Sequence, residues 1–487
     1  MNAIPAKDCC PIQILKLSNE DKAIRILCEY FESADISGKE AEDELFSLRT
    51  VSYPYDNLPP SIQTRWWAGR YIGIANIAIS KSRYEISIRP RFGENFLLAI
   101  LEDLYNIKVG RHDANAAQSS EWFSSLLYLL QKRMWVEKCS KANRYGLPRT
   151  NVKHGHQGAT LRGALDLNRT IMPWLMHKEV CTNTFEKVLD EHICKIVYEA
   201  YRILSTNIVS PERKNIKGKK SDVGFGFSMP PTVQETINSL ITQFKGTQFV
   251  FTENDYQRIR YKSIYQSWKP LVDFSWSIIR GRQLGYTASD SQAECVFVDM
   301  AEIWESFLRK KLGEGLKGDG WRVLSVEECR YRIYKGQFYQ RDIIPDIILQ
   351  RGDEYIVFDA KYKRMRGKKA NGKNSDVDRS DLFQIHTYIQ FVQHYLGNVV
   401  LGGLLYPISK KGYNDDGTPY EYSEAEVIDT NSYHADNLFG VAGRENSPQI
   451  PFIIDGIYCS ETDNKDSMDN SINAMIARIR NILNKQH

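Results

Sequence analysis

The sequence has no uninterrupted apolar stretch near the ~20 residues that a membrane-spanning helix requires. Its first residues also lack the apolar core of a secretion signal. We therefore expect a cytoplasmic protein without membrane contact. The nine cysteines show no metal-ligand spacing, so we expect free, buried thiols in place of disulfides or a zinc site.

A strong excess of charge is absent as well. The net charge is +4 over 487 residues, so the surface as a whole is not expected to bind nucleic acid indiscriminately. The length exceeds the roughly 250–300 residues at which one core stops growing, which predicts two or three domains. We predict a mixed α+β domain over 1–150, a mainly helical middle region over 151–290 and an α/β domain over 291–487.

A complete nucleotide-binding loop is also missing. Residues 367–373 match the first seven positions of a phosphate-binding P-loop, but Asn374 follows where Ser or Thr must hold Mg²⁺. We therefore do not expect this segment to bind nucleotide. His154 and His156 flank a glycine with no further ligands at useful spacing, a pattern that indicates a turn.

The sequence does contain two neighbouring apolar runs with charged side chains near their ends. Residues 343–349 and 354–362 flank a turn at 351–353, and this pattern predicts a β-hairpin. Because side chains alternate between the two faces of a strand, Asp359 and Lys361 share one face, next to the expected place of Asp346.

This grouping suits the hydrolysis of a phosphodiester. Mg²⁺ takes oxygen ligands, commonly one or two carboxylates with waters and phosphate, and Asp346 and Asp359 supply such carboxylates. Lys361 is placed to orient the attacking water and to stabilise developing negative charge. The alternative is an aspartate in a surface turn beside an ordinary Asp/Lys pair at a strand end.

Helical segments flank the predicted hairpin. Residues 294–312 have a helical period, and Glu305 borders their apolar stripe, where it either assists the metal and its water or is a solvated charge. A second helix begins near residue 381 and places Gln384 on the face of Tyr388. With a strand over 398–407, the order helix, strand, strand, helix, strand predicts an α/β core.

Other segments carry clear periodic patterns. Apolar spacing predicts helices over 96–105, 122–135, 185–204, 256–268 and 468–483, and a hairpin over 70–88. Just after the proposed site comes a basic run that we expect to contact a DNA backbone, although a solvated loop is the alternative. The residues predicted to bind DNA are Lys363, Arg364, Arg366, Lys368 and Lys369.

Four short motifs together resemble one protein family. They are Phe358-Asp359-Ala360-Lys361-Tyr362, Glu302-Ile303-Trp304-Glu305-Ser306-Phe307, Gln384-Ile385-His386-Thr387-Tyr388 and Gly402-Gly403-Leu404-Leu405-Tyr406-Pro407. With Pro345-Asp346 they are similar to the PD-(D/E)xK nuclease superfamily and, more narrowly, to McrC-type subunits of McrBC-like, modification-dependent (type IV) restriction systems. The nuclease match covers about residues 291–410. Fainter similarity upstream includes residues 86–93, 161–166 and 182–189, the last of which resembles the start of the family's middle helix.

The resemblance implies a specific function. It implies a restriction-endonuclease-like core in the C-terminal domain and an Mg²⁺-dependent DNA endonuclease, active with Mn²⁺ in vitro, that serves anti-phage defence. The implied catalytic residues are Asp346, Asp359, Lys361, Glu305 and Gln384, and the implied metal ligands are Asp346, Asp359 and Glu305. The implied partners are an McrB-like AAA+ GTPase hexamer, docked by the N-terminal region, and double-stranded, modified DNA.

Two alternatives stay open at this point. The chain is either such a nuclease or a non-catalytic DNA-binding or assembly subunit on a nuclease-like fold. A further alternative is a nuclease that serves another restriction or phage-defence system with a different motor.

Overall fold

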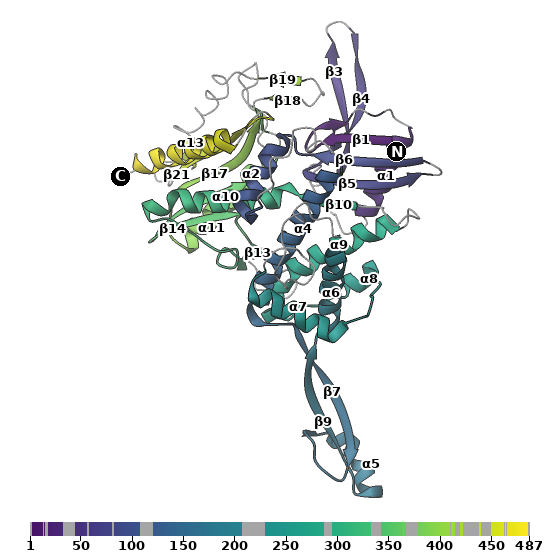
Figure 1. Ribbon diagram of the computed structural model, residues 1–487. Coiled ribbons are helices and arrows are strands. Elements are labelled where there is room, and N and C mark those ends of the chain that lie inside the picture. Colours follow the sequence, from purple (N-terminus) through teal and green to yellow (C-terminus); the bar gives the residue numbers. More distant parts are fainter. Residues whose placement is uncertain are drawn as a thin grey trace, which may run out of the picture. The chain divides into compact units, whose positions relative to one another are not determined.

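The structure is a computed structural model, shown in Figure 1. It describes residues 2–12, 14, 18–32, 44–55, 58–79, 82–107, 120–206, 229–286, 295–332, 342–363, 365–366, 378–409, 411–413, 419–421, 438–439, 450–461, 463 and 465–485. The chain forms two compact units, Met1–Phe123 with Phe297–His487 and Ser124–Val296. Both units contain helices and strands, which confirms the expected mixed α and β composition. The three predicted domain ranges stay a prediction.

The first unit contains a seven-stranded sheet. Its order is β11-β14-β15-β17-β21-β20, and β16 pairs with β17. The strands are β11 (Arg322–Val323), β14 (Ile347–Arg351), β15 (Glu354–Ala360), β16 (Met365–Arg366), β17 (Asn398–Ser409), β20 (Leu438–Phe439) and β21 (Ile450–Cys459). β14 and β15 pair antiparallel, which confirms the predicted hairpin, whereas β15, β17 and β21 run parallel.

The middle of this sheet is buried because its strands are continuous apolar runs. Residues 401–409 of β17 are all buried, as expected for a parallel strand covered on both faces. Gly402 and Gly403 make close packing possible there. A Cβ on Gly402 would lie 2.3 Å from the Ile389 side chain, and one on Gly403 would lie 2.3 Å from the Ile453 carbonyl oxygen.

Helices cover the sheet in the predicted order. α11 (Arg379–Tyr395) lies against β15 and β17, while α10 (Met300–Leu316) contacts β14, β15 and α13 (Lys465–Asn484). The helix expected over 294–312 is only partly correct, because Cys295–Asp299 form strand β10 and Asp299 caps the helix that follows. The helix expected over 468–483 is confirmed by α13.

Smaller sheets are built from N-terminal residues, and β10 adds a strand to one of them. One has the order β1-β6-β5-β10 and another the order β2-β4-β3. Their strands are β1 (Asn2–Lys7), β2 (Pro11–Ile12), β3 (Phe46–Tyr55), β4 (Leu58–Ala68), β5 (Tyr71–Ile79) and β6 (Ser82–Arg89). β5 and β6 confirm the predicted hairpin. Helices α1 (Asn19–Glu32) and α2 (Gly93–Tyr105) accompany them, and α2 confirms the helix expected over 96–105.

Short two-stranded sheets complete the described part of this unit. β12 (Tyr331–Arg332) pairs with β13 (Asp342–Ile343), and β18 (Lys411–Tyr413) pairs with β19 (Pro419–Glu421). A short 3-10 turn, η3 (Lys317–Asp319), follows α10.

The second unit is a helical body that carries a β-ribbon. The body contains α4 (Ser120–Ala142), η1 (Asn143–Tyr145), α6 (Glu191–Thr206), α7 (Pro231–Phe244), α8 (Glu253–Gln257), η2 (Ser263–Trp268) and α9 (Lys269–Tyr286). The helix expected over 256–268 is broken, because residues 258–262 separate α8 from η2. Trp268, Leu271 and Val197 are among the fully buried side chains of its core.

The ribbon corrects three sequence-based predictions. β7 (Arg149–Gly158) pairs antiparallel with β9 (Val180–Leu189), and β8 (Ala164–Leu165) pairs with β9. Residues 182–189 are therefore strand, the helix expected over 185–204 begins only at Glu191, and His154-Gly155-His156 lie within β7 instead of a turn. Residues 182–189 mix polar with apolar side chains, and pairing with β7 decides their conformation.

The far end of the ribbon exposes apolar side chains. Figure 1 shows β7 and β9 projecting from the helices of their own unit, with α5 (Leu167–His177) at the end away from them. Large apolar residues at this end are between 43% and 69% exposed. We call them the apolar tip; they are Leu161, Leu165, Leu167, Ile171, Met172, Trp174, Leu175 and Met176.

All nine cysteines are free, and only Cys181 is not fully buried, which confirms the prediction of free thiols. Among the described helices, none combines the length and the apolar character needed to cross a bilayer.

Candidate active site

Strand register brings the two predicted carboxylates together. Ile347 on β14 faces Phe358 on β15, so Asp346, one residue earlier, comes opposite Asp359. The backbone N–H of Ala360 donates to Asp346 Oδ2 at 2.9 Å, which fixes that carboxylate against the end of β15. Asp359 is fully buried and Asp346 is half-buried.

The pKa values of both carboxyl groups are raised above the ordinary value for aspartate. Burial raises the pKa of Asp359 well above its ordinary value, and the negative charge of Asp346 raises it further. Burial also raises the pKa of Asp346, with a contribution from Glu305, while the Ala360 N–H and Lys361 oppose the change. Two desolvated carboxylates side by side repel each other unless a proton or a cation lies between them.

Lys361 is the cation that lies beside this pair. Its Nζ is 2.9 Å from Asp359 Oδ2, which confirms that these two side chains share a face of β15. Burial alone would lower the pKa of Lys361, but the charges of Asp359 and Asp381 raise it overall. The ammonium group is therefore charged at neutral pH.

Helix α11 supplies the other contacts of the Lys361 ammonium group. Its Nζ donates to Gln384 Oε1 at 2.7 Å, and Gln384 Nε2 donates to the Tyr388 hydroxyl at 2.8 Å. Gln384 thus holds Lys361 in place, and Tyr388, one helical turn further along α11, orients Gln384. Burial raises the pKa of Tyr388 to about 12, so this hydroxyl keeps its proton.

Asp381 is a site residue that sequence reasoning missed. Its Oδ1 lies 3.2 Å from Lys361 Nζ and 3.1 Å from Lys363 Nζ, and the side chain is buried. Burial raises the pKa of Asp381, and the two lysines oppose that shift. The sequence does contain a signal for it: Asp381 lies three residues before Gln384, which places both side chains on one face of the helix.

Glu305 comes from helix α10, whereas the two aspartates come from the hairpin of β14 and β15. It is a half-buried residue of α10, close enough for its charge to raise the pKa of Asp346. In the portion of the chain that the structure describes, no three His, Cys, Asp or Glu side chains are grouped closely enough to hold a metal. On the same helix Arg309 donates to the Asp346 main-chain carbonyl, which fixes the backbone before β14.

The residues predicted to bind DNA are only partly described. Lys363 forms ion pairs with Asp378 at 2.9 Å and with Asp381, so its charge is engaged within the site. Arg366 belongs to β16, but its side chain is not described. Arg364, Lys368 and Lys369 lie outside the described residues.

The donor set fits a hard divalent cation at the aspartate pair. Both carboxylate oxygens of Asp359 are buried; Oδ2 is paired with Lys361 Nζ, and Oδ1 has no hydrogen-bonding partner among the described residues. Mg²⁺ is commonly bound through one or two carboxylates together with water and substrate phosphate. Asp346 and Asp359 would hold the ion, whose chemistry is to polarise a phosphoryl oxygen and to acidify a bound water.

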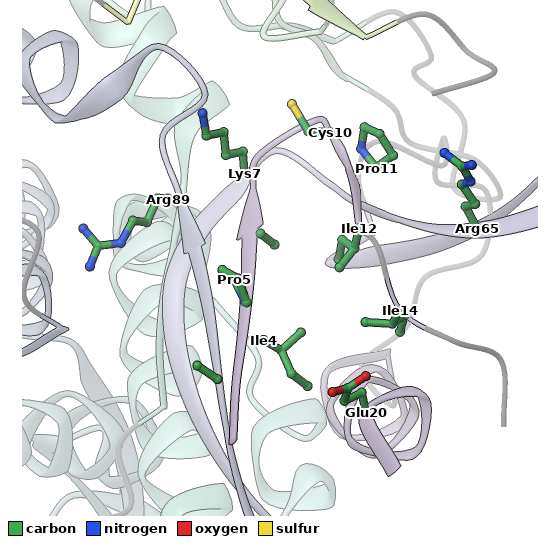
Figure 2. A pocket seen from close by; sticks show the side chains of 12 residues that line it. Ile4, Pro5, Lys7, Cys10, Pro11, Ile12, Ile14, Glu20, Arg65 and Arg89 are labelled. Carbon is green, nitrogen blue, oxygen red and sulfur yellow. The ribbon is translucent and has the colours of Figure 1, made fainter. Parts of the chain in front are cut away.

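A separate pocket lies in the N-terminal sheets of the same unit. It has a volume of about 480 Å³ and is lined by residues of β1, β2, α1, β4 and β6. Figure 2 shows Lys7, Arg65 and Arg89 as its cationic side chains and Glu20 as its acidic one. None of the residues predicted as site residues lines it, so it is distinct from the aspartate pair.

Comparison with known proteins identifies the family. Residues 67–407 match the family model described as "McrBC 5-methylcytosine restriction system component". The chain therefore belongs to this family, which confirms the resemblance to McrC-type subunits noted in the sequence. No curated protein matches the chain.

Two solved assemblies from Thermococcus gammatolerans are similar to the chain. One is a half-complex from a tetradecameric assembly of McrB AAA+ hexamers with bound McrC, with 15% identity, a TM-score of 0.36, and coverage of 97% of this chain and 100% of the other. The second is a cryo-EM structure of the McrBC complex, with 16% identity, a TM-score of 0.31, and coverage of 65% and 88% respectively. At these TM-scores neither structure adds to the assignment of the fold.

Proposed function

We propose that this McrBC family member is the Mg²⁺-dependent DNA endonuclease subunit of a modification-dependent restriction complex. The observation that carries the proposal is the convergence of Asp346, Asp359 and Lys361 across two neighbouring strands. Two carboxylates and an ammonium group in one desolvated site are the groups that metal-assisted phosphodiester hydrolysis needs. The sheet with flanking α10 and α11 would then be a PD-(D/E)xK core.

The side chains divide the work of such a site. Asp346 and Asp359 would hold the metal, and Glu305, whose charge reaches Asp346, would help to orient a water beside it. Lys361 stabilises the negative charge that develops on the phosphate, because its charge is fixed in a site of low polarity. Gln384 holds the lysine in place, so it positions the reacting group without touching substrate.

The partner we propose is an AAA+ GTPase hexamer of the McrB type, with double-stranded modified DNA as substrate. The support is family membership together with the apolar tip, because many large apolar side chains exposed at one end of the ribbon indicate an interaction surface. Leu167, Leu175 and Met176 are each between 66% and 69% exposed there. This surface lies at 161–176, just beyond the region 1–150 that the sequence suggested for docking.

A cleavage assay with the assembled complex tests the proposal. The chain and its AAA+ partner are incubated with GTP and plasmids with and without 5-methylcytosine, in Mg²⁺ or in EDTA. We expect cutting only with Mg²⁺, and none by Asp359→Ala. Asp353→Ala, in the exposed turn between the same strands, is the matched control.

The outcomes separate the two function classes. Cutting that needs Mg²⁺ and Asp359 supports the nuclease. Undiminished cutting by Asp359→Ala contradicts the assigned site, and DNA binding without any cutting by the wild-type complex indicates the non-catalytic assembly subunit. Cutting with a different motor in place of the GTPase would assign the chain to another defence system.

A further inference from the structure

A buried polar cluster joins the N-terminal sheets to the segment that follows Asp359. Its members are Asp8, Arg91 and Tyr362, which are 0%, 8% and 2% exposed. Asp8 follows β1, Arg91 follows β6, and Tyr362 is adjacent to Lys361. Burying a charged pair is costly unless its geometry is well satisfied, so this cluster calls for an explanation beyond packing.

Arg91 makes its contacts with the segment 361–363. Its Nη2 donates to the Lys363 carbonyl oxygen at 3.1 Å, and its guanidinium lies 4.6 Å from the centre of the Tyr362 ring. On its other side the guanidinium lies 4.7 Å from the Phe92 ring. Arg91 therefore touches the backbone and a side chain of the segment that carries Lys361.

Asp8 holds Arg91 in this position. The Asp8 carboxylate accepts a hydrogen bond from the Arg91 backbone N–H and forms an ion pair at 3.7 Å with Nη1. The next residue, Cys9, has φ +52, an uncommon conformation for a residue with a Cβ. Its thiol points at the Tyr362 carbonyl oxygen, 3.8 Å away. The turn after β1 is thus fitted against Tyr362 on one side and Arg91 on the other.

Side chains alternate in direction along the segment 361–363. Lys361 and Lys363 point to the α11 side, where both reach Asp381. Tyr362 points the opposite way, where its ring lies 6.3 Å from that of Trp304. The Lys361 N–H donates to the Leu405 carbonyl oxygen at 2.9 Å. β17 therefore fixes the segment before Tyr362, and Arg91 fixes it after Tyr362.

We propose that Arg91 is a positioning residue for the nuclease site, because it holds the backbone at 362–363 so that Lys361 meets Asp359 and Lys363 meets Asp381. This inference rests on the proposed function and adds to it a residue 268 positions before Asp359. Through Arg91 and Asp8 the N-terminal sheets would contribute to cleavage by positioning Lys361, in addition to any role they have in docking.

The test compares Arg91→Met, Arg91→Lys and Asp8→Asn in the assembled complex. Arg89→Met is the matched control, because Arg89 lies two residues earlier, pairs with Glu94 and contacts the Phe123 ring. The readouts are the cleavage rate at saturating Mg²⁺ and DNA, the DNA concentration for half-maximal rate, and GTPase stimulation of the motor.

We expect Arg91→Met to lower the maximal cleavage rate about 10–100-fold, the usual effect of removing a group that orients a metal site from outside. Half-saturation by DNA and GTPase stimulation should stay within about twofold, since neither depends on the exact place of Lys361. Arg91→Lys should restore most of the rate, because it keeps the charge beside Asp8. Asp8→Asn should give a smaller loss, and Arg89→Met none.

The possible outcomes distinguish the role of Arg91 from the proposed nuclease function. Wild-type cleavage by Arg91→Met, or an equal loss in Arg89→Met, overturns the inference while leaving the nuclease proposal intact. If Arg91→Met does not fold, Asp8→Asn decides: a reduced rate with unchanged motor stimulation supports positioning, and a wild-type rate contradicts it. A wild-type complex that never cuts in Mg²⁺ refutes the proposed function itself.

Discussion

Two regions of this chain place side chains where folding alone would not favour them, and they do so in opposite ways. At the ends of β14 and β15, charged groups are buried: Asp359 is 0% exposed. At the apolar tip of the ribbon, apolar groups are exposed: Trp174 is 48% and Leu175 66% exposed. We propose that a divalent cation joins the aspartates in the first region and that a partner surface covers the second.

If the two regions act independently, a substitution at the aspartate site should leave motor binding intact, and a substitution at the apolar tip should leave the aspartate site intact. The largest effect is expected for Lys361→Met, which removes the ammonium group next to Asp359. We expect the cleavage rate of the assembled complex to fall about 10²–10³-fold, because a fixed group that stabilises developing charge is lost. Motor binding and GTPase stimulation should remain at wild-type levels.

Lys310→Met provides the control for this loss, since Lys310 lies on α10 and donates to the Asp103 carbonyl oxygen away from the aspartates. A Lys361→Met complex that cuts at the wild-type rate would remove the lysine from the mechanism.

The reciprocal change is Trp174→Ser with Leu175→Ser at the apolar tip. We expect affinity for the AAA+ partner to fall about 30-fold or more, as for loss of an aromatic interface anchor. The unfolding temperature of the isolated chain should hardly change, because both side chains are exposed. Binding is measured by titration with the purified motor. An unchanged affinity would mean that another surface docks the motor.

A smaller effect is expected at the edge of the site. Asp381→Asn leaves Lys361 and Lys363 without their shared carboxylate partner. The cleavage rate should fall about tenfold, since the lysines are then less firmly placed. The neighbouring Asp378, which is exposed and pairs only with Lys363 among the described ion pairs, should tolerate the same substitution. Equal effects at both positions would argue against a special role for Asp381.

The smallest effect concerns stability in the absence of metal. Burial and the adjacent Asp346 raise the pKa of Asp359 well above its ordinary value, so the folded chain binds this proton more tightly than the unfolded chain does. The free energy of unfolding therefore falls as pH rises from the unfolded pKa near about 4 through the folded pKa.

Asp359→Asn removes this penalty. Above the folded pKa of Asp359 we expect the variant to be more stable by about 0.5–2 kcal/mol, the usual gain from relaxing a functional site. The gain should fade on acidification. Chemical denaturation of the EDTA-treated chain at several pH values measures it, with Asp353→Asn as control. A gain that grows at low pH would contradict the sign of the shift.

The site hairpin was predictable from sequence because its determinants are local. The apolar runs on each side of Gly352 fix β14 and β15, and strand alternation alone places Lys361 beside Asp359. Asp381 was not predictable in the same way, because its role arises from α11 packing on β15 and β17. The role of Arg91 was even harder to predict, since only the fold brings residue 91 to residue 362.

The ribbon shows the opposite limit of sequence reasoning. Residues 182–189 lack strong alternation, and β9 exists because β7 pairs with it along the whole length. Likewise Cys295–Asp299 carry apolar side chains compatible with either helix or strand, and pairing in the sheet with β5 decides the outcome. Partners distant in the chain determine such segments.

Calorimetric titration of Mn²⁺ into the isolated wild-type chain and into Asp359→Asn tests directly whether the aspartates bind a divalent ion, because it needs neither motor nor DNA. We expect a divalent-ion site in the wild-type chain that is lost in the variant, with protons released on binding. Equal binding by both chains would contradict the claim that these aspartates hold the metal.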